Sequence, residues 1–369
     1  MERFQKLLED RHSYAREWKS RTGGRVLGYF CHYFPEEIAY AAGVLPVRIL
    51  GQPDTEGISQ RYIYGGSFCS YCWNLLAAGL KGDYDYLDGL AHSQCCESIN
   101  GSYSSWRLHV PVGYDYFVAM PSYIDGPGTA LYLRSEMSAC RDSMEEWTRK
   151  KITDETLDNA IEVYNTSRNL MRQVYQYRRS QDPVVSGAEA FEMVLSSQIM
   201  DKEEHNKLLI DALNKLPGRS KSYTGPRLML IGSEINDTGL VRFIESMGAT
   251  IVIDRLCGGS SYIWNNVIPN EDRLLALSYA YLDKPRCPVK DEAYRHRIND
   301  IMTLAIDYNV QGMVYNIHRF CTPHQQDRPP LFKAFQNKLI PVHEIEYDGT
   351  IPMQEFKFRI ETFVDTLKK

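Results

Sequence analysis

The stretch GRVLGYFCHYFPEEIAYAAGVLPVRILG, residues 24–51, predicts a strand, a helix and a second strand in quick succession. Residues 25–30 and 44–50 are apolar runs of the kind found in buried strands. Pro35, followed directly by two glutamates, is typical of a helix start, and Gly43 is a typical helix stop. Two strands that are joined through a helix indicate one unit of a parallel sheet.

The alternation of strand and helix continues on both sides of a helical middle. Residues 86–93 and 114–121 complete a first α/β region. A second α/β region holds RLMLIGS (227–233), TIVIDRL (250–256), GMVYNIH (312–318) and LIPVHEIEYD (339–348), with helices at 240–247 and 291–307. From residue 141 to about 216, apolar residues recur only at helical spacing. We therefore predict an α/β protein with two Rossmann- or flavodoxin-like parallel-sheet lobes, spanning residues 1–140 and 223–369, and a helical connector at 141–222.

Composition narrows the classes of function. The chain has 369 residues, 43% of them hydrophobic and 24% charged, with a net charge of −5, so it lacks the basic excess of a nucleic-acid-binding protein. It contains no apolar run long enough for a membrane span, and the charged N-terminal region lacks the apolar core of a signal peptide. We expect a cytoplasmic protein that binds neither membranes nor nucleic acid. Nine cysteines in that compartment are more often buried thiols or metal ligands than disulfides.

Three cysteines, Cys69, Cys96 and Cys321, stand where a predicted strand or turn leads into a helix. Strand-to-helix loops of a parallel α/β protein converge on one crevice. Three thiolates that meet there could hold an iron–sulfur cube by three corners and leave its fourth iron open for chemistry. For any one of these cysteines alone, a packed thiol is the more common explanation.

The neighbouring cysteines leave alternatives open. Cys69 and Cys72 form a C-x2-C pair, but no second pair follows at short range, so a structural zinc site is improbable. Cys95 and Cys96 are adjacent, and adjacent side chains on an extended segment point in opposite directions. We therefore expect only one of these two thiols to face the crevice.

Several acid–base candidates lie near the same strand ends. His92 ends the third predicted strand, and Glu37 lies in the first turn of the helix that begins at Pro35. A histidine at a strand end is a suitable proton donor, and a glutamate that points into the crevice would be a functional carboxylate. Both residues also have ordinary structural explanations. They are tentative catalytic candidates, with His32 and His318 as further histidines at loop positions.

Several longer motifs resemble the 2-hydroxyacyl-CoA dehydratase and benzoyl-CoA reductase family over essentially the whole chain. They are the stretch at 24–51, FCSYCWNLLAAGLKGDYDYLDGLAHSQCCES (68–98), SSWR (104–107), RQVYQYRR (172–179), SGAEAFEMVL (186–195) and GMVYNIHRFC (312–321). The nearer type in that family is the smaller of the two cluster-carrying subunits. The resemblance implies one [4Fe–4S] cluster per chain, ligated by Cys69, Cys96 and Cys321, with Cys96 preferred to Cys95 because Glu97 and Trp106 follow it.

The resemblance also implies partners and a reaction. A related, larger cluster-carrying subunit would complete a heterodimer, and a separate ATP-hydrolysing iron–sulfur activator would supply single electrons of very low potential. The substrate would be an acyl-CoA thioester that is reduced to a ketyl radical. We expect ring reduction of the benzoyl-CoA type.

Three alternatives remain open at this stage. The chain could be a subunit of an (R)-2-hydroxyacyl-CoA dehydratase, or a noncatalytic electron-relay subunit. It could also be a homodimeric reductase with a double-cubane cluster, since Cys31 and Cys257 lie where such relatives place cysteines. Ser233 stands where those relatives have a cysteine, which makes the double cube the less favoured of the cluster types.

Overall fold

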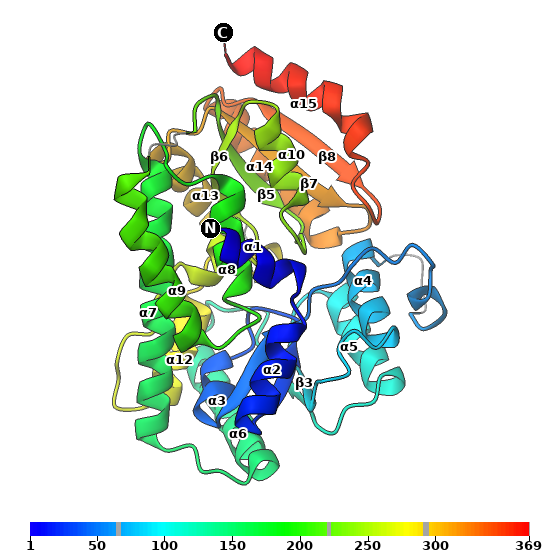
Figure 1. Cartoon of the computed structure of the whole chain (residues 1–369), viewed down its shortest axis with the longest axis vertical. Coiled ribbons are helices and arrows are strands. Elements are labelled where there is room, and N and C mark those ends of the chain that lie inside the picture. The colour runs from blue at the N-terminus through cyan, green and yellow to red at the C-terminus, as the bar shows by residue number, and fades with distance from the viewer. Residues whose placement is uncertain (64–67, 220–222, 291–294, 369) are drawn as a thin grey trace.

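Two parallel four-stranded sheets, one in each lobe, organise the molecule (Figure 1). The computed structural model describes residues 1–63, 68–219, 223–290 and 295–368. The first sheet has the order β2-β1-β3-β4 and the second the order β6-β5-β7-β8. The strands are β1 Arg25–Tyr29, β2 Val44–Arg48, β3 Gly89–Ser93, β4 Asp115–Val118, β5 Arg227–Gly232, β6 Thr250–Arg255, β7 Gly312–His318 and β8 Val342–Tyr347. The predicted fold class, with two parallel-sheet lobes, is confirmed.

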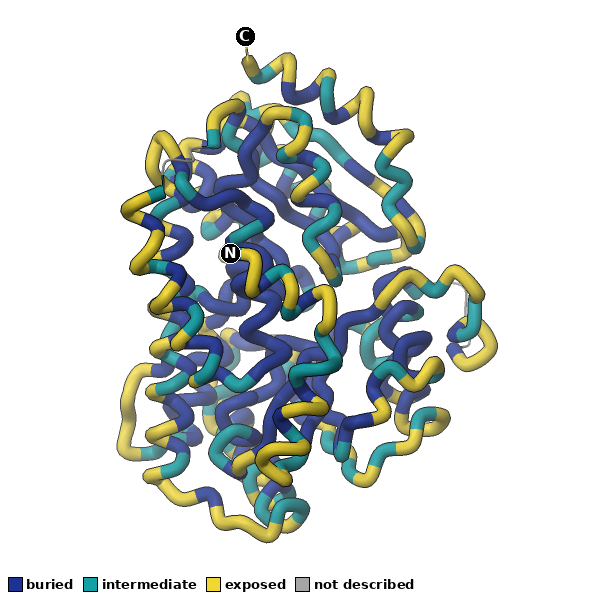
Figure 2. The backbone as a smooth tube through the Cα atoms, viewed as in Figure 1, coloured by how far each residue is buried: buried dark blue, intermediate teal, exposed yellow. Residues whose placement is uncertain are grey.

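Both sheets are covered by helices, which explains the apolar character of their inner strands. Every residue of the inner strands β3 and β7 and of the edge strands β2 and β6 is buried, whereas the opposite edge strands β4 and β8 are partly exposed (Figure 2). Strands that are buried on both faces read as continuous apolar runs. The covering helices are α1 Glu2–Glu9, α2 Ser13–Thr22, α3 Glu36–Ala41, α4 Ser70–Leu80, α5 Glu97–His109, α6 Thr129–Thr148, α10 Gly239–Ser246, α11 Ser260–Ile263, α12 Arg273–Leu282, α13 Arg295–Asp307, α14 Thr322–Asn337 and α15 Met353–Leu367.

The strand order gives each lobe a switch point. In the first sheet the chain moves outward on one side from β1 to β2 and on the other from β1 to β3, and the second sheet repeats this pattern with β5, β6 and β7. In open parallel sheets, ligands bind outside the carboxyl ends of the strands at such a point. The loops that leave these six strands are therefore the places to search for a site.

Three helices form the middle of the chain. They are α7 Asp154–Arg179, α8 Gly187–Ser196 and α9 Lys202–Lys215. Helix α7, at 26 residues, is about 39 Å long and runs beside both lobes (Figure 1). Its start is fixed by Thr153, whose side chain accepts a hydrogen bond from the backbone N–H of Thr156. The predicted division into lobes at 1–140 and 223–369 and a connector at 141–222 stays a prediction.

The two lobes exchange segments. Helix α12 follows the strand β6 of the second sheet, yet Leu277 and Tyr281 pack in one apolar core with Met137 of helix α6 and Leu27 of strand β1. In return, Phe4 of helix α1 packs with residues of the second lobe. Each lobe therefore depends on residues that are distant in the sequence. Of the helix predicted at 291–307, α13 accounts for 295–307, and residues 291–294 lie outside the described residues.

The described helices include none that is both long enough and apolar enough to cross a membrane.

The end of strand β5 requires a glycine. Gly232 has φ +131°, and an added Cβ would lie 1.8 Å from the backbone oxygen of Asn316 in β7. Gly82 also has a positive φ, +81°, but an added Cβ there would meet no atom within 4 Å.

We expect Gly232→Ala to lower the free energy of unfolding by about 4 kcal/mol or more, because the backbone of two paired strands must separate. Gly82→Ala, the matched control, has only the conformational cost of an alanine in the left-handed region, roughly 1–2 kcal/mol. Urea unfolding, followed by circular dichroism, measures both. Equal losses in the two variants would contradict the proposed collision at Gly232.

Candidate functional site

A cavity of about 80 Å³ lies between the lobes, at the carboxyl ends of the strands. Eight of the nine cysteines of the chain line it, and the ninth, Cys140, is buried in helix α6 away from the cavity. Apolar side chains, among them Phe30, Ile99 and Val289, form other parts of its wall. The cysteines are Cys31, Cys69, Cys72, Cys95, Cys96, Cys257, Cys287 and Cys321.

The three predicted ligand cysteines occupy equivalent positions in the fold. Cys69, Cys96 and Cys321 are the N-cap residues of helices α4, α5 and α14, and none of the three side chains caps its own helix. Helix N-termini present free N–H groups and the positive end of the helix dipole. Both favour a thiolate over a thiol and stabilise a negatively charged group held by that thiolate.

The sulfur atoms form a nearly continuous series. The Sγ atoms of Cys69 and Cys72 lie 3.5 Å apart. Hydrogen bonds from Cys321 and then from Cys72 lower the pKa of the Cys69 thiol well below its usual value. Hydrogen bonds from Cys72 and then from Cys95 have the same effect on the pKa of Cys96. The three predicted ligands are thus brought together from three different loops.

One expectation about these thiols is wrong. Cys95 and Cys96 were expected to face opposite sides, but both line the cavity. The strand β3 ends at Ser93 and helix α5 begins at Glu97, so the two cysteines lie in a turn. The alternation of side chains across a strand does not apply to a turn.

This donor set is chemically suited to an iron–sulfur cluster. Thiolates are the ligands that such clusters take, and the apolar walls reduce contact with solvent. Among the described residues, no three His, Cys, Asp or Glu side chains converge closely enough to hold a single metal ion. Cys69, Cys96 and Cys321 are the residues that would hold three corners of a cluster.

The cavity also contains polar groups that sequence reasoning did not find. Arg48, at the end of strand β2, forms a buried ion pair with Glu234, with 3.3 Å between Nη2 and Oε2. Glu234 lies in the loop after strand β5, and its Oε2 also accepts a hydrogen bond from the N–H of Gly258. Burial raises the pKa of Glu234, and its second oxygen, Oε1, has no partner among the described residues. Arg48 could have been singled out from the sequence, because a charged residue at the end of a buried strand indicates a functional site or a buried partner.

Two of the three histidines in the cavity wall, His318 and His32, differ in their hydrogen bonding. The Nε2–H of His318 donates to the carbonyl oxygen of Glu234 at 2.9 Å, because a carbonyl oxygen can only accept. Burial lowers the pKa of His318, so the ring is neutral and its Nδ1 accepts from the hydroxyl of Ser70 at 2.9 Å. His32 is 1% exposed and has no hydrogen-bond partner at either ring nitrogen among the described residues. Burial lowers the pKa of His32 well below its usual value, so its ring is neutral with one free N–H.

His92, a predicted catalytic candidate, lies next to the cavity without lining it. Its Nε2 is 2.8 Å from the side-chain oxygen of Asn100 and 3.6 Å from the sulfur of Cys95. Burial lowers the pKa of His92 to about 4, so the ring is neutral and its Nε2–H donates to Asn100. This geometry positions the loop that carries Cys95, and the catalytic role stays a prediction.

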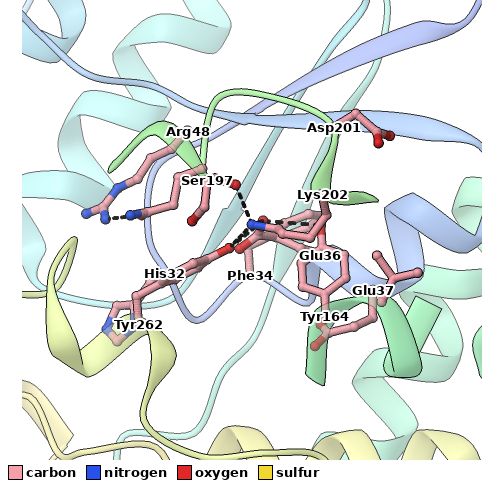
Figure 3. A network of polar contacts seen from close by, with 12 residues as sticks. His32, Phe34, Glu36, Glu37, Arg48, Tyr164, Ser197, Asp201, Lys202 and Tyr262 are labelled. Atoms are coloured by element: carbon pink, nitrogen blue, oxygen red, sulfur yellow. Dashed lines mark hydrogen bonds and ion pairs between the residues drawn. The ribbon is translucent and has the colours of Figure 1, made fainter. Parts of the chain in front are cut away.

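Glu37, the second catalytic candidate, lies outside the cavity in a buried polar network. It is fully buried, pairs with the guanidinium of Arg168 and accepts a hydrogen bond from Tyr281 at 2.7 Å. Its neighbour Glu36 accepts from Tyr262 at 3.0 Å and lies 3.9 Å from Lys202, as the close view shows (Figure 3). The network joins helices α3, α7, α9, α11 and α12.

A second cavity, of about 350 Å³, opens beside the first. Its lining includes Phe68, Trp73 and Phe320. Ser70 also lines it and connects it to the first cavity, because Ser70 hydrogen-bonds His318 in the wall of that cavity. Phe320 directly precedes Cys321 and has φ +64°, an uncommon conformation for an aromatic residue. Asp54 and Asp348 also line this cavity, whereas its described lining includes no lysine or arginine.

Two similar parallel-sheet lobes, with cysteines at their facing switch points, define the class of protein. The family model for the 2-hydroxyglutaryl-CoA dehydratase D-component matches residues 31–367, and the chain belongs to this family. The resemblance inferred from the sequence motifs is confirmed.

The chain is similar to curated proteins along almost its whole length. It is 28% identical to a benzoyl-CoA reductase subunit of Thauera aromatica, over 96% of this chain and 94% of that protein. It is 24% identical to the (R)-phenyllactyl-CoA dehydratase beta subunit of Clostridium sporogenes, over 99% and 97%. It is 21% identical to the (R)-2-hydroxyglutaryl-CoA dehydratase beta subunit of Acidaminococcus fermentans, over 100% and 98%. These relatives are enzyme subunits of oxidoreductase and lyase types, in agreement with the prediction of an enzyme subunit.

The Glu37–Arg168 pair provides a test of the buried network. Burial raises the pKa of Glu37, but the charges of Arg168 and Lys284 and the hydrogen bonds from Arg168 and Tyr281 together outweigh this effect, so the net pKa lies below the usual 4.5. The pair therefore contributes stability above pH 4.5 that is lost as the pH falls through the lower folded-state pKa. In Arg168→Met the largest of the lowering effects is removed, so the folded-state pKa of Glu37 rises and less stability is lost as the pH falls.

We expect Arg168→Met to lower the free energy of unfolding at pH 7 by about 3–5 kcal/mol, with a smaller loss at pH 4. Lys207→Met, which breaks the exposed Lys207–Glu203 pair on helix α9, should cost about 0.5 kcal/mol or less. Urea unfolding at both pH values measures these differences. A pH-independent loss in Arg168→Met would show that Glu37 does not titrate as described.

Proposed function

We propose that this chain is the iron–sulfur subunit of an ATP-driven, low-potential one-electron reductase that acts on an acyl-CoA thioester. The supporting observation is the common position of Cys69, Cys96 and Cys321, each at the N-terminus of a helix and each facing one cavity. A [4Fe–4S] cluster held there would accept and donate single electrons, with one iron free of protein ligands.

The residues of the chain would prepare this site in three ways. Three helix N-termini stabilise the negative charge of the thiolates. The apolar wall around Phe30 and Ile99 excludes water from a reactive reduced state. His32, with an unpartnered ring and a free N–H, would donate a hydrogen bond to a group bound in the cavity.

The relatives are named as subunits, which supports a partner chain. We propose a cytoplasmic heterodimer in which the partner is a related, larger protein that also carries a cluster. A separate ATP-hydrolysing iron–sulfur activator would supply its electrons.

Benzoyl-CoA-type ring reduction is our leading assignment of the reaction. The second cavity supports it, because Phe68, Trp73 and Phe320 offer aromatic surfaces for stacking against a planar ring. Dehydration of an (R)-2-hydroxyacyl-CoA through a ketyl radical is the second candidate, since the matched family model and two of the relatives above are named for dehydratases.

The ligand assignment is tested by cysteine substitution in protein purified without oxygen. We expect Cys69→Ala, Cys96→Ala and Cys321→Ala each to lose most of the bound iron and the charge-transfer absorbance in the visible range. Cys140→Ala, which removes a buried thiol outside the cavity, should retain both. Unchanged iron content in Cys321→Ala would end this assignment.

Iron content also separates the single cube from a double-cubane cluster. The remaining cavity thiols, Cys31, Cys95, Cys257 and Cys287, are a specific observation in favour of the larger cluster. A single cube predicts about four irons per chain and no loss in Cys31→Ala or Cys257→Ala. About eight irons, reduced to about four in those variants, would establish the double cube instead.

Turnover with purified partner and activator distinguishes the reactions. We expect ATP-dependent consumption of benzoyl-CoA with formation of a non-aromatic product, and at least a tenfold lower rate with (R)-2-hydroxyacyl-CoA thioesters. Product analysis by mass spectrometry measures both. Preferential loss of water from the 2-hydroxyacyl substrate would favour the dehydratase.

A further inference from the structure

Two buried lysines next to the thiol cavity lack a carboxylate partner. Lys284 and Lys290 are 3% and 1% exposed. The ammonium of Lys290 donates to the backbone oxygens of Pro121 at 2.8 Å and Met120 at 3.3 Å, and that of Lys284 to the backbone oxygen of His32 at 2.6 Å. Among the described residues, neither ammonium has a carboxylate oxygen within 4.0 Å. In contrast, Arg48, Arg168 and Arg297 are paired with Glu234, Glu37 and Asp327.

Both charges lie on the same side of the cavity. The two Nζ atoms are each 5.8 Å from the ring centre of Tyr33, which is itself buried. Lys290 ends the short 3₁₀ helix η3 (Pro288–Lys290), whose first two residues line the cavity together with Cys287. This side is built from the loops that carry Cys31 and Cys287, and not from the loops that carry the three predicted ligands.

A buried ammonium without a counter-ion is unfavourable. Burial, and then the charge of Arg168, lower the pKa of Lys284 to about 8, whereas the carboxylates of Glu37 and Glu36 and then Cys31 raise it. Burial also lowers the pKa of Lys290, and negative charge on Cys287, Cys31 and Cys95 would raise it again. The backbone oxygens satisfy hydrogen bonds but carry no net charge. The negative charges that raise the pKa of Lys290 are therefore all thiolates on the cavity side, and Lys284 is influenced both by Cys31 and by the carboxylates of the buried network.

We propose that Lys284 and Lys290 are the counter-charges of an anionic, thiolate-bound group in the cavity and that they raise its reduction potential. The proposal rests on the proposed iron–sulfur function. When the group accepts one electron from dithionite or from a protein donor, it gains one negative charge and no bond forms or breaks. A nearby positive charge stabilises the reduced form more than the oxidised form. These lysines therefore raise the reduction potential without touching the substrate.

The test is a redox titration by EPR of anaerobically purified protein, with iron measured separately. Lys290→Gln and Lys284→Gln remove the charge and keep an N–H donor for the backbone oxygens. At a fixed potential we expect the ratio of reduced to oxidised cluster to fall roughly tenfold in each, equivalent to about 59 mV for a one-electron couple. Lys290→Arg and Lys284→Arg keep the charge and should restore the ratio to within about twofold of wild type.

A third buried lysine is the matched control. Lys202 is 2% exposed and, unlike Lys284 and Lys290, lies within 4.0 Å of a carboxylate, at 3.9 Å from Glu36. Lys202→Gln should change the ratio by less than about twofold. Equal midpoints in wild type and both cavity-side glutamine variants, with full iron content, would overturn the proposal. If wild-type protein contains no iron, the proposed iron–sulfur function is refuted instead. A glutamine variant that fails to fold is replaced by the corresponding methionine variant.

Discussion

Parallel strands end on one side of a sheet, and this constraint determines where every functional group of the protein lies. Each lobe repeats the same strand order, so each has one switch point with diverging loops. The two switch points face each other. Cysteines that are up to 290 residues apart in sequence, Cys31 and Cys321, therefore line one cavity without any direct contact between their strands. Neither lobe alone carries all of the cavity cysteines, so the site is complete only when the two lobes of the chain pack together.

Charge is handled differently in the two buried regions of the molecule. In the network around Glu36 and Glu37, each carboxylate has cationic and phenolic partners, so the region is internally balanced. The thiol cavity is not balanced in this way: helix N-termini, Lys284 and Lys290 all contribute positive potential, and Glu234 is the carboxylate in its wall. The first region holds helices together, whereas the positive potential of the second would stabilise the anionic group proposed for the cavity.

The sequence was sufficient for the fold class and for the placement of Cys69, Cys96 and Cys321, because strand periodicity and helix-start signals are local. It was not sufficient for Arg48–Glu234 or for the two lysines, since these contacts join elements whose approach is decided by tertiary packing. Glu37 illustrates the same limit. Its position in a first helical turn is readable from Pro35, but its partner Arg168 comes from the middle of helix α7, about 130 residues further along the chain. The end of strand β3 at residue 93 was predicted correctly, but the alternation of side chains was wrongly applied to Cys95 and Cys96, which lie in the turn between β3 and α5.

The return of helix α12 to the first lobe has a consequence for biosynthesis. A ribosome that has completed the first sheet and helix α6 has not yet made Leu277 and Tyr281, so the apolar surface they cover stays open during much of translation. Cys321 emerges later still. The proposed cluster would therefore be completed only after the last third of the chain has been synthesised, when all three predicted ligands are present.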